Sequence, residues 1–298
     1  MSDIDTNTIA AGAVIGDCYE VIKALHVGQS SAVYLAEHSL TSKSVALKIL
    51  LHPVERSSLE RLQVEAKCLA RIDSANVVRV QNMGVEPDGM PYLVMDYIEG
   101  EGLDKIIERG RINDLHRFRD LFGQACSALE DVHKCQIVHR NISPSNFLIS
   151  SAAKESELLT LIGFTFARSL KDKTTEPIGE VVGNPYYMSP EQCLGEAVDH
   201  RSDIYSLGCS MFEALTGTPP FPCQSTVEAM SKHISEQPVL KLTDIPDFAP
   251  VQAVILRCLE KKPEDRFQSA AEVKLALVGQ QVKTKASGFL RGLKVWGK

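Results

Sequence analysis

A change of hydrophobic periodicity near residue 100 constrains the fold most strongly. In residues 19–50, three stretches alternate apolar and polar side chains and are rich in β-branched residues: "YEVIKAL", "AVYLAEH" and "SVALKIL". This alternation predicts three antiparallel strands joined by short loops at 26–31 and 38–43. Beyond Gly100, the apolar residues recur every three or four positions, which predicts helices. We therefore expect a small β-rich lobe followed by a larger α-rich lobe.

The first lobe should also contain one helix and two more strands. "SSLERLQVEAKCLARI" has helical spacing, and Ser57 followed by Glu60 predicts a capping box at its start. "VVRVQNMGV" and "PYLVMDYI" flank the turn signal "EPDG" and predict a strand pair. The expected fold class is α+β, with five strands and one helix in the smaller lobe.

The second lobe should be mainly helical. "LHRFRDLFGQACSALEDVH" places its apolar residues on one face, and "SDIYSLGCSMFEALTG" predicts a helix that Ser202 caps and Gly217 ends. "VQAVILRCLEKKPEDRF" and "SAAEVKLALV" predict further helices. We expect an N-terminal segment at 1–18, a first lobe at 19–97, a second lobe at 98–278 and a basic tail at 279–298.

Composition excludes several classes of function. The formal net charge of −6 gives no reason to expect a nucleic-acid partner. The eight cysteines form no CxxC pair, which favours reduced thiols over zinc sites or disulfides. No apolar run has the length of about 18 residues that a membrane span needs, and the acidic start lacks the basic region of a signal peptide. These features predict a cytoplasmic protein.

The basic tail differs in charge from the rest of the chain. Residues 279–298 hold five Lys or Arg and no acidic residue. Phe289, Leu293 and Trp296 recur at helical spacing, so a short amphipathic helix could touch a membrane surface or a partner. A helix docked on its own domain, or a frayed end, is the alternative.

Several spaced motifs occur together in one order. They are "VALK" (Val45–Lys48), Glu65 on the following helix, "HRNISPSN" (His139–Asn146), "SPE" (Ser189–Glu191), "SDIYSLG" and Arg266. With this order of elements the chain resembles a protein kinase of the bacterial Ser/Thr type over about residues 19–278. The resemblance implies a bilobal kinase-like fold and a nucleotide site between the lobes.

The resemblance also implies roles for single residues. Lys48 would reach the α- and β-phosphates of ATP and Glu65 would hold it, although a plain surface ion pair is the alternative. Asn146 would bind a second Mg²⁺ or, alternatively, would only order its loop. In the family, Asp203 and the pair Glu191–Arg266 are structural. The other expected site residues surround the nucleotide: Gly28 over the phosphates, Val33, Ala46 and Leu148 around adenine, Met95 as gatekeeper, and the hinge from Asp96 to Ile98.

The loop "HRNISPSN" departs from the family at its catalytic position. Asn141 stands where the family has the Asp that accepts or orients the substrate proton, and an amide cannot take a proton at neutral pH. General-base catalysis contributes roughly 10²–10⁴ in rate. Ser143 replaces a Lys that contacts the γ-phosphate, and Asn184 replaces the Thr that binds that Lys. Both partners of one family interaction are therefore absent.

The metal and phosphate positions also differ from the family. In "LIGFTFAR", Gly163 replaces the metal-binding Asp of the Asp-Phe-Gly motif and Thr165 replaces its Gly, whereas Phe164 is retained and can pack against His139. Asn146 and the phosphates alone form a thin oxygen set for Mg²⁺. In the loop over the phosphates only Gly28 remains, because His26 and Ser31 replace the other two glycines.

These departures predict a pseudokinase: a nucleotide-responsive binding or scaffolding module that holds ATP weakly, without a firm Mg²⁺ site. Its partner would be a protein, such as an active kinase or that kinase's substrate. An atypical but active Ser/Thr protein kinase is the alternative, since positioning and electrostatics dominate phosphoryl transfer. A small-molecule phosphotransferase of related fold is a third class. Arg140 is retained and could pair with a phosphorylated Thr174 or Thr175.

Overall fold

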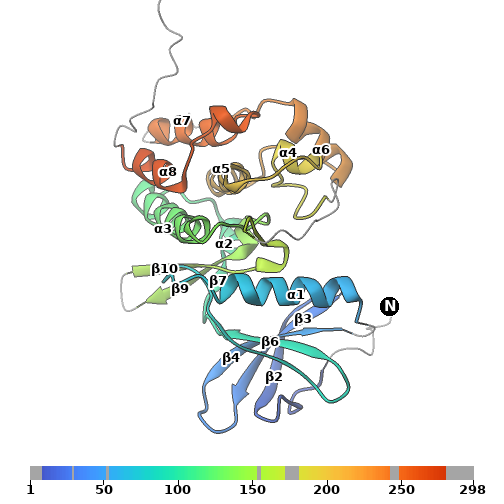
Figure 1. Cartoon of the computed structure of the whole chain (residues 1–298). Helices are drawn as coiled ribbons and strands as arrows, with labels where there is room; N and C mark the ends of the chain where they lie inside the picture. The colour runs from blue at the N-terminus through green and yellow to red at the C-terminus, as the bar shows by residue number, and fades with distance from the viewer. Residues whose placement is uncertain are drawn as a thin grey trace, which may run out of the picture.

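The computed structural model describes residues 9–28, 30–51, 54–152, 156–171, 181–241 and 248–279. The chain forms two lobes stacked one on the other, with helix α1 lying between the first lobe's sheet and the second lobe (Figure 1). The order of elements changes close to Gly100: most of the long strands precede it and most of the helices follow it.

The first lobe is built on an antiparallel sheet in the order β1-β2-β3-β4-β6-β5. The three strands expected in residues 19–50 and the later strand pair are all present. The sheet has one strand more than expected, because β1 adds to its edge beside β2. A two-residue strand is too short to show alternation in a sequence. The strands are β1 (Val14–Ile15), β2 (Tyr19–Val27), β3 (Ser31–His38), β4 (Ser44–Leu50), β5 (Val80–Val85) and β6 (Pro91–Asp96).

Helix α1 (Arg56–Leu69) confirms the predicted helix but not its predicted cap. Its N-cap residue is Glu55, whose side chain accepts no capping hydrogen bond. The Ser57 hydroxyl instead donates to the Glu55 carboxylate at 3.3 Å. The predicted capping box at Ser57 and Glu60 was therefore wrong, because the helix begins two residues earlier than the motif requires.

The second lobe is mainly helical, with α3 and α8 side by side and α5 at its centre (Figure 1). Two small sheets carry the loops of the site: β11-β8 packs against α1 and α3, and β10-β9-β7 packs against α2 and α3. The helices are α2 (Leu103–Arg109), α3 (Leu115–Lys134), α4 (Pro190–Cys193), α5 (His200–Thr216), α6 (Thr226–Ser235), α7 (Ala249–Cys258) and α8 (Ala270–Leu277). The short strands and turns are β7 (Glu101–Gly102), β8 (Ile137–Val138), η1 (Pro144–Asn146), β9 (Phe147–Ala152), β10 (Ser156–Leu161), η3 (Phe164–Phe166), β11 (Arg168–Ser169) and η5 (Pro263–Asp265).

Helix α5 is buried along most of its length and ends, as predicted, at Gly217, whose φ of 81° suits a glycine. Its start differs from the prediction. Asp199 is the N-cap and accepts from the Arg201 amide at 2.8 Å. Ser202 is fully buried and donates to Glu191 at 2.5 Å. Asp and Ser are both good N-caps, so the sequence alone did not distinguish them.

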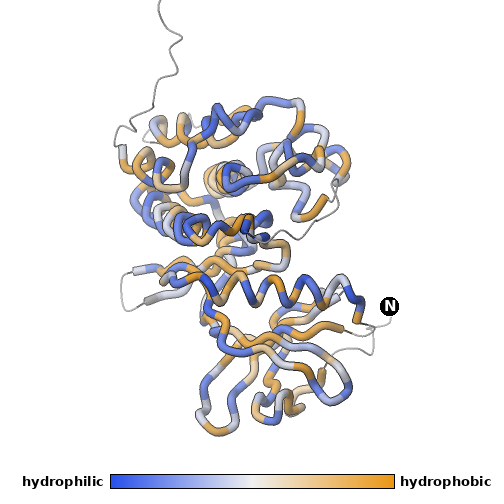
Figure 2. The backbone as a smooth tube through the Cα atoms, viewed as in Figure 1, coloured by the Kyte–Doolittle hydropathy of each residue, from blue (hydrophilic) through white to orange (hydrophobic). Residues whose placement is uncertain are grey.

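Two hydrophobic clusters stabilise the molecule. The larger joins α1 to the helices of the second lobe, and the smaller fills the other side of the first lobe's sheet. Apolar residues concentrate along the strands and on the inner sides of the helices, and the connecting turns are largely hydrophilic (Figure 2). Among the described residues, no helix combines the length and apolar character needed to cross a bilayer.

Candidate functional site

The strand register brings the expected adenine-binding residues of the first lobe onto one face. Val33 pairs with Lys48 between β3 and β4, and Ala46 pairs with Met95 between β4 and β6. Val33 and Ala46 remain partly exposed, whereas their neighbours along each strand are buried on the other side of the sheet. Met95 is nearly buried. This face of the sheet can therefore provide an apolar roof for a planar base.

Leu148 lies next to the strand that follows the hinge. It pairs with Gly102 between β9 and β7. A Cβ at Gly100 would lie 2.6 Å from the Ile149 carbonyl oxygen, so a glycine is needed where the chain after the hinge passes β9. The Asp96 carboxylate accepts from Gln81 at 2.5 Å and from Lys43 at 3.4 Å. These exposed partners hold the Asp96 side chain on the outer surface, and Ile98 is half-buried.

Lys48 and Glu65 form the central ion pair. Lys48 Nζ donates to Glu65 Oε2 at 2.5 Å, and the two side chains are only 8% and 3% exposed. The pair is therefore not the exposed surface pair that was the alternative. Lys48 Nζ also donates to the Thr165 hydroxyl at 2.7 Å. Local sequence patterns do not predict this contact, because Thr165 differs from the family's glycine without any motif that links it to Lys48.

Asp203 fixes the backbone of the catalytic-type loop. Its buried carboxylate accepts from the backbone amides of His139 and Arg140 at 2.9 and 2.8 Å, and from His133 Nε2 at 2.8 Å. Burial alone would raise the pKa of Asp203, but the His133 bond and the other bonds lower that pKa below its usual value. Arg140 has a φ of 63° and donates through Nε to the Phe166 carbonyl at 2.7 Å. The Asp203 carboxylate therefore holds the backbone at the start of the loop, and the Arg140 side chain links the loop to Phe166.

The loop residues themselves bond to each other. Asn146 Nδ2 donates to the Asn141 carbonyl oxygen at 2.7 Å. Ser143 is buried, and its hydroxyl lies 3.0 Å from the Ser145 hydroxyl. Asn141 is half-buried and offers an amide where the family has a carboxylate. Asn146 therefore bonds within the loop, whichever of its two predicted roles holds, and the loop contains no acidic side chain.

The space beside Gly163 is filled by Asn146. Gly163 has a φ of 80°, and a Cβ built on it would overlap Asn146 Oδ1 and lie 2.7 Å from Asn146 Cγ. Among the described residues, no group of three or more His, Cys, Asp or Glu side chains could hold a metal ion. A hard divalent cation prefers carboxylate oxygens, and here Gly163 offers no side-chain oxygen and Asn146 an amide. The family's metal-binding carboxylate is therefore absent at Gly163.

Phe164 connects the loop to the core. Its ring packs edge-on against the His139 ring, with 4.5 Å between the ring centroids. Phe164 also belongs to the same buried cluster as Leu69 of α1. His139 Nε2 donates to the Ile162 carbonyl at 3.0 Å, and burial lowers the pKa of the ring. The apolar packing between the lobes is therefore retained although the polar chemistry beside it is changed.

A buried ion pair stabilises α4, and a turn at Asn184 precedes this helix. Glu191 receives two bonds from Arg266, at 2.7 and 2.8 Å, and both side chains are buried. Burial raises the pKa of Glu191, but the Arg266 bonds outweigh it and the pKa lies below its usual value. Asn184 accepts from the Tyr186 amide at 3.2 Å and shapes the turn. Thr174 and Thr175 lie outside the described residues, as does the tail from residue 280 on.

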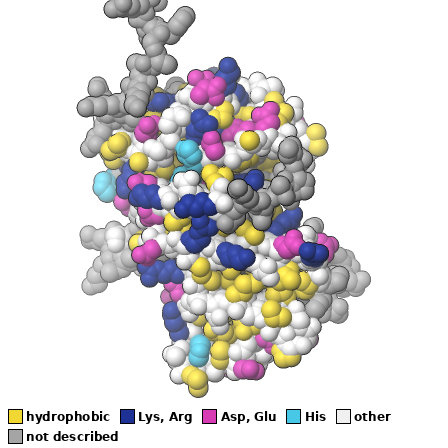
Figure 3. All heavy atoms as spheres, in the orientation of Figure 1, with side chains coloured by type: hydrophobic (Ala, Val, Ile, Leu, Met, Phe, Trp, Pro, Cys, Tyr) yellow, Lys and Arg dark blue, Asp and Glu magenta, His cyan; other side chains and the backbone are white. Residues whose placement is uncertain are grey.

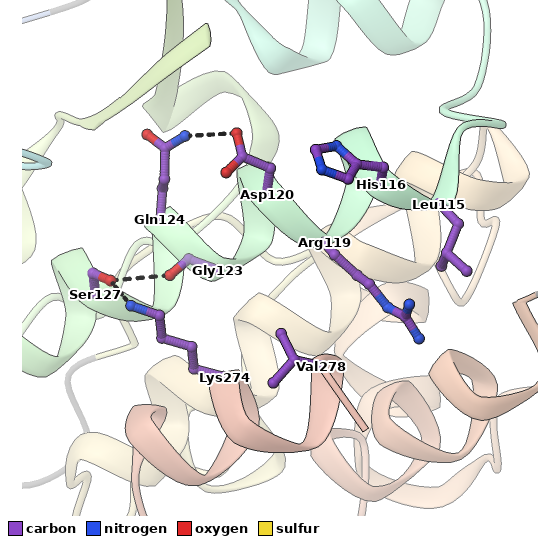
Figure 4. Close-up of a pocket in the computed structure, with 9 residues that line it drawn as sticks. All are labelled: Leu115, His116, Arg119, Asp120, Gly123, Gln124, Ser127, Lys274 and Val278. Carbon is purple, nitrogen blue, oxygen red and sulfur yellow. Dashed lines mark hydrogen bonds between the residues drawn. The ribbon is translucent and has the colours of Figure 1, made fainter. Parts of the chain in front are cut away.

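A hollow lined by none of these residues lies between α3 and α8, with a volume of about 630 Å³ (Figure 4). Two pairs of its polar side chains bond to each other: Lys274 Nζ donates to the Ser127 hydroxyl at 2.7 Å, and Gln124 donates to Asp120 at 3.1 Å. Lys and Arg side chains gather instead where α1 meets the second lobe (Figure 3). We therefore assign the candidate site to the residues around Lys48, Asn146 and Gly163.

Three features together define a protein-kinase-type fold. They are the sheet with its buried Lys48–Glu65 pair, the loop held by Asp203 and the buried Glu191–Arg266 pair. The protein kinase domain matches residues 19–276. A probable serine/threonine-protein kinase of Clostridium acetobutylicum is 35% identical over 268 residues, covering 88% of this chain and 40% of the relative. The serine/threonine-protein kinase PknB of Mycolicibacterium smegmatis is 35% identical over 272 residues, covering 89% and 43%. The serine/threonine-protein kinase pkn3 of Myxococcus xanthus is 32% identical over 275 residues, covering 89% and 50%.

The chain belongs to the protein kinase domain family and is similar to bacterial serine/threonine-protein kinases. It spans half or less of the length of these curated relatives. The family implies a site for ATP. The expected bilobal α+β fold is confirmed.

Proposed function

We propose that this domain is a pseudokinase, a binding module that takes up a nucleotide without a firm metal site and transfers little or no phosphate. One observation carries the proposal: Gly163 supplies no ligand, and Asn146 fills the space in which a metal-binding side chain would begin. Asn141 removes the proton acceptor at the same end of the cleft. The buried Lys48–Glu65 pair and the apolar roof retain what is needed to bind a base and its phosphates.

The binding partner of the module would be a protein, either an active kinase or one of that kinase's substrates. The module would act in the cytoplasm. Loss of the catalytic groups leaves the fold and its surfaces available for recognition. The basic tail would contribute a contact with that partner or with a membrane surface. Nucleotide binding would bias the arrangement of the lobes, because it contacts both of them.

An atypical active kinase is the second candidate, and the assembled Lys48–Glu65 pair favours it. Positioning and electrostatics supply most of the catalysis of phosphoryl transfer, so a missing base does not by itself abolish turnover. In this case the metal would have to arrive bound to ATP, and phosphates and water would supply most of its ligands.

One set of measurements separates the two candidates. The melting temperature is measured with ATP in Mg²⁺ and in EDTA, beside phosphotransfer to a generic protein substrate. Ligand at a hundredfold excess over Kd stabilises by about 2.7 kcal/mol. A pseudokinase shows a similar shift with and without metal and no transfer. Transfer by the wild type that Lys48→Met abolishes, while the exposed control Lys134→Met does not, would establish the active kinase instead.

A further inference from the structure

The environment of Lys48 contains a group that its family position does not explain. The ammonium has three donor hydrogens and is almost completely buried. One hydrogen goes to Glu65 at 2.5 Å and another to the Thr165 hydroxyl at 2.7 Å. The third remains for a phosphate oxygen, so both bonds are compatible with a bound nucleotide.

Thr165 comes from a different part of the chain than the ion pair. It is the middle residue of η3, which begins directly after Gly163 and packs against α1. Lys48 belongs to β4 and Glu65 to α1. A single nitrogen atom therefore joins the first lobe's sheet, the helix between the lobes and the segment that follows the lost metal position.

Energetics favour such an additional partner. A buried ion pair repays the loss of hydration only when further hydrogen bonds satisfy the remaining donors. A hydrogen bond to a charged group contributes more than a neutral one, and leaving such a donor unmet is costly. Thr165 supplies an oxygen from within the protein. A glycine at this position, as in the family, has no side-chain acceptor to offer.

We propose that Thr165 is a positioning residue that holds Lys48, Glu65 and α1 in their assembled arrangement when neither nucleotide nor metal is bound. The idea deepens the proposed function and rests on it, because a metal-independent binding module needs its phosphate-binding lysine set in place by the protein. Thr165 contacts Lys48 and would act on the nucleotide through that side chain.

Hydrogen–deuterium exchange on the nucleotide-free protein tests the proposal. Thr165→Val keeps the shape and removes the hydroxyl, and we expect the amides of α1 to exchange about tenfold faster, as the loss of one charge-assisted bond implies. Thr165→Ser retains the hydroxyl and should restore slow exchange. Thr216→Val removes a hydroxyl that bonds to the Phe212 carbonyl in α5 and should leave α1 unchanged.

Two further arms separate positioning from general stability. In a Lys48→Met background, Thr165→Val should no longer change α1 exchange, because the partner is absent. In EDTA, Thr165→Val should weaken ATP binding about tenfold and Thr165→Ser should not. Equal α1 exchange in the wild type and Thr165→Val, or a Ser variant that behaves as Val does, would overturn the proposal. Wild-type protein that binds no ATP would instead refute the nucleotide-binding part of the proposed function, and the exchange result on Thr165 would still hold.

Discussion

The Asn146 side chain occupies the space beside Gly163. A Cβ built on Gly163 would lie only 2.7 Å from Asn146 Cγ. Asn146 is held there by the bond from its Nδ2 to the Asn141 carbonyl oxygen. Three positions that the family uses for chemistry therefore form one contact network here. Reintroducing an acidic residue at Gly163 must displace a side chain that is already bonded.

Gly163→Ala should lower the free energy of unfolding by about 1–3 kcal/mol, because a φ of 80° strains an L-residue and the methyl group meets Asn146. Urea unfolding measures the change. The loss should shrink in an Asn146→Ala background, where only the backbone strain remains. Gly123→Ala is the control: this glycine lies in α3 with open space around it and should be neutral or stabilising. An unchanged stability of Gly163→Ala would contradict the overlap.

Asn141→Asp alone should not restore phosphotransfer. The new carboxylate would supply the proton acceptor, but Gly163 still provides no metal ligand, and both groups act on the same transition state. We expect ATP binding within about twofold of wild type and transfer at the background of Lys48→Met, measured with radiolabelled ATP. Adding Gly163→Asp should give transfer only if Asn146 moves aside. Robust turnover by Asn141→Asp by itself would show that the metal position is not limiting.

Glu191→Gln should destabilise the protein by about 3–5 kcal/mol, because it leaves the fully buried Arg266 guanidinium without its counter-charge. Thermal and urea unfolding report the loss. Combining it with Arg266→Met should cost less than the sum of the two single changes, since no charge then remains unpaired. Glu130→Gln breaks an exposed pair with Lys134 and should hardly change stability. Additive losses would contradict this account.

Much of the fold could be predicted from periodicity and a few spaced motifs. The strands of residues 19–50, helix α3 and the end of α5 at Gly217 follow from local patterns, and the Lys48–Glu65 pair followed from the resemblance. Local patterns failed at Ser202, where Asp199 is an equally good cap, and at Ser57, where the helix starts at a residue without a side-chain cap. They also could not reveal Thr165 against Lys48, because that contact joins residues 117 positions apart through the packing of η3 on α1.

His233 should make the stability depend on pH. Burial lowers the pKa of His233 to about 4, and its neutral ring accepts from the Tyr205 hydroxyl at 2.8 Å and donates to the Tyr186 carbonyl at 3.0 Å. Its pKa is depressed in the folded state, so its contribution to the unfolding free energy is complete above about pH 6.5. Between about pH 6.5 and 4 this contribution declines, because in that interval the histidine takes up a proton in the unfolded chain but not in the folded one. Between pH 7.5 and 5 we expect a loss of about 2 kcal/mol, measured by urea unfolding. His233→Gln keeps a donor and an acceptor but cannot titrate, so its unfolding free energy should fall less over the same interval. Equal pH dependence in the two proteins would mean that other groups cause it, and that Tyr186 is not anchored by a neutral histidine.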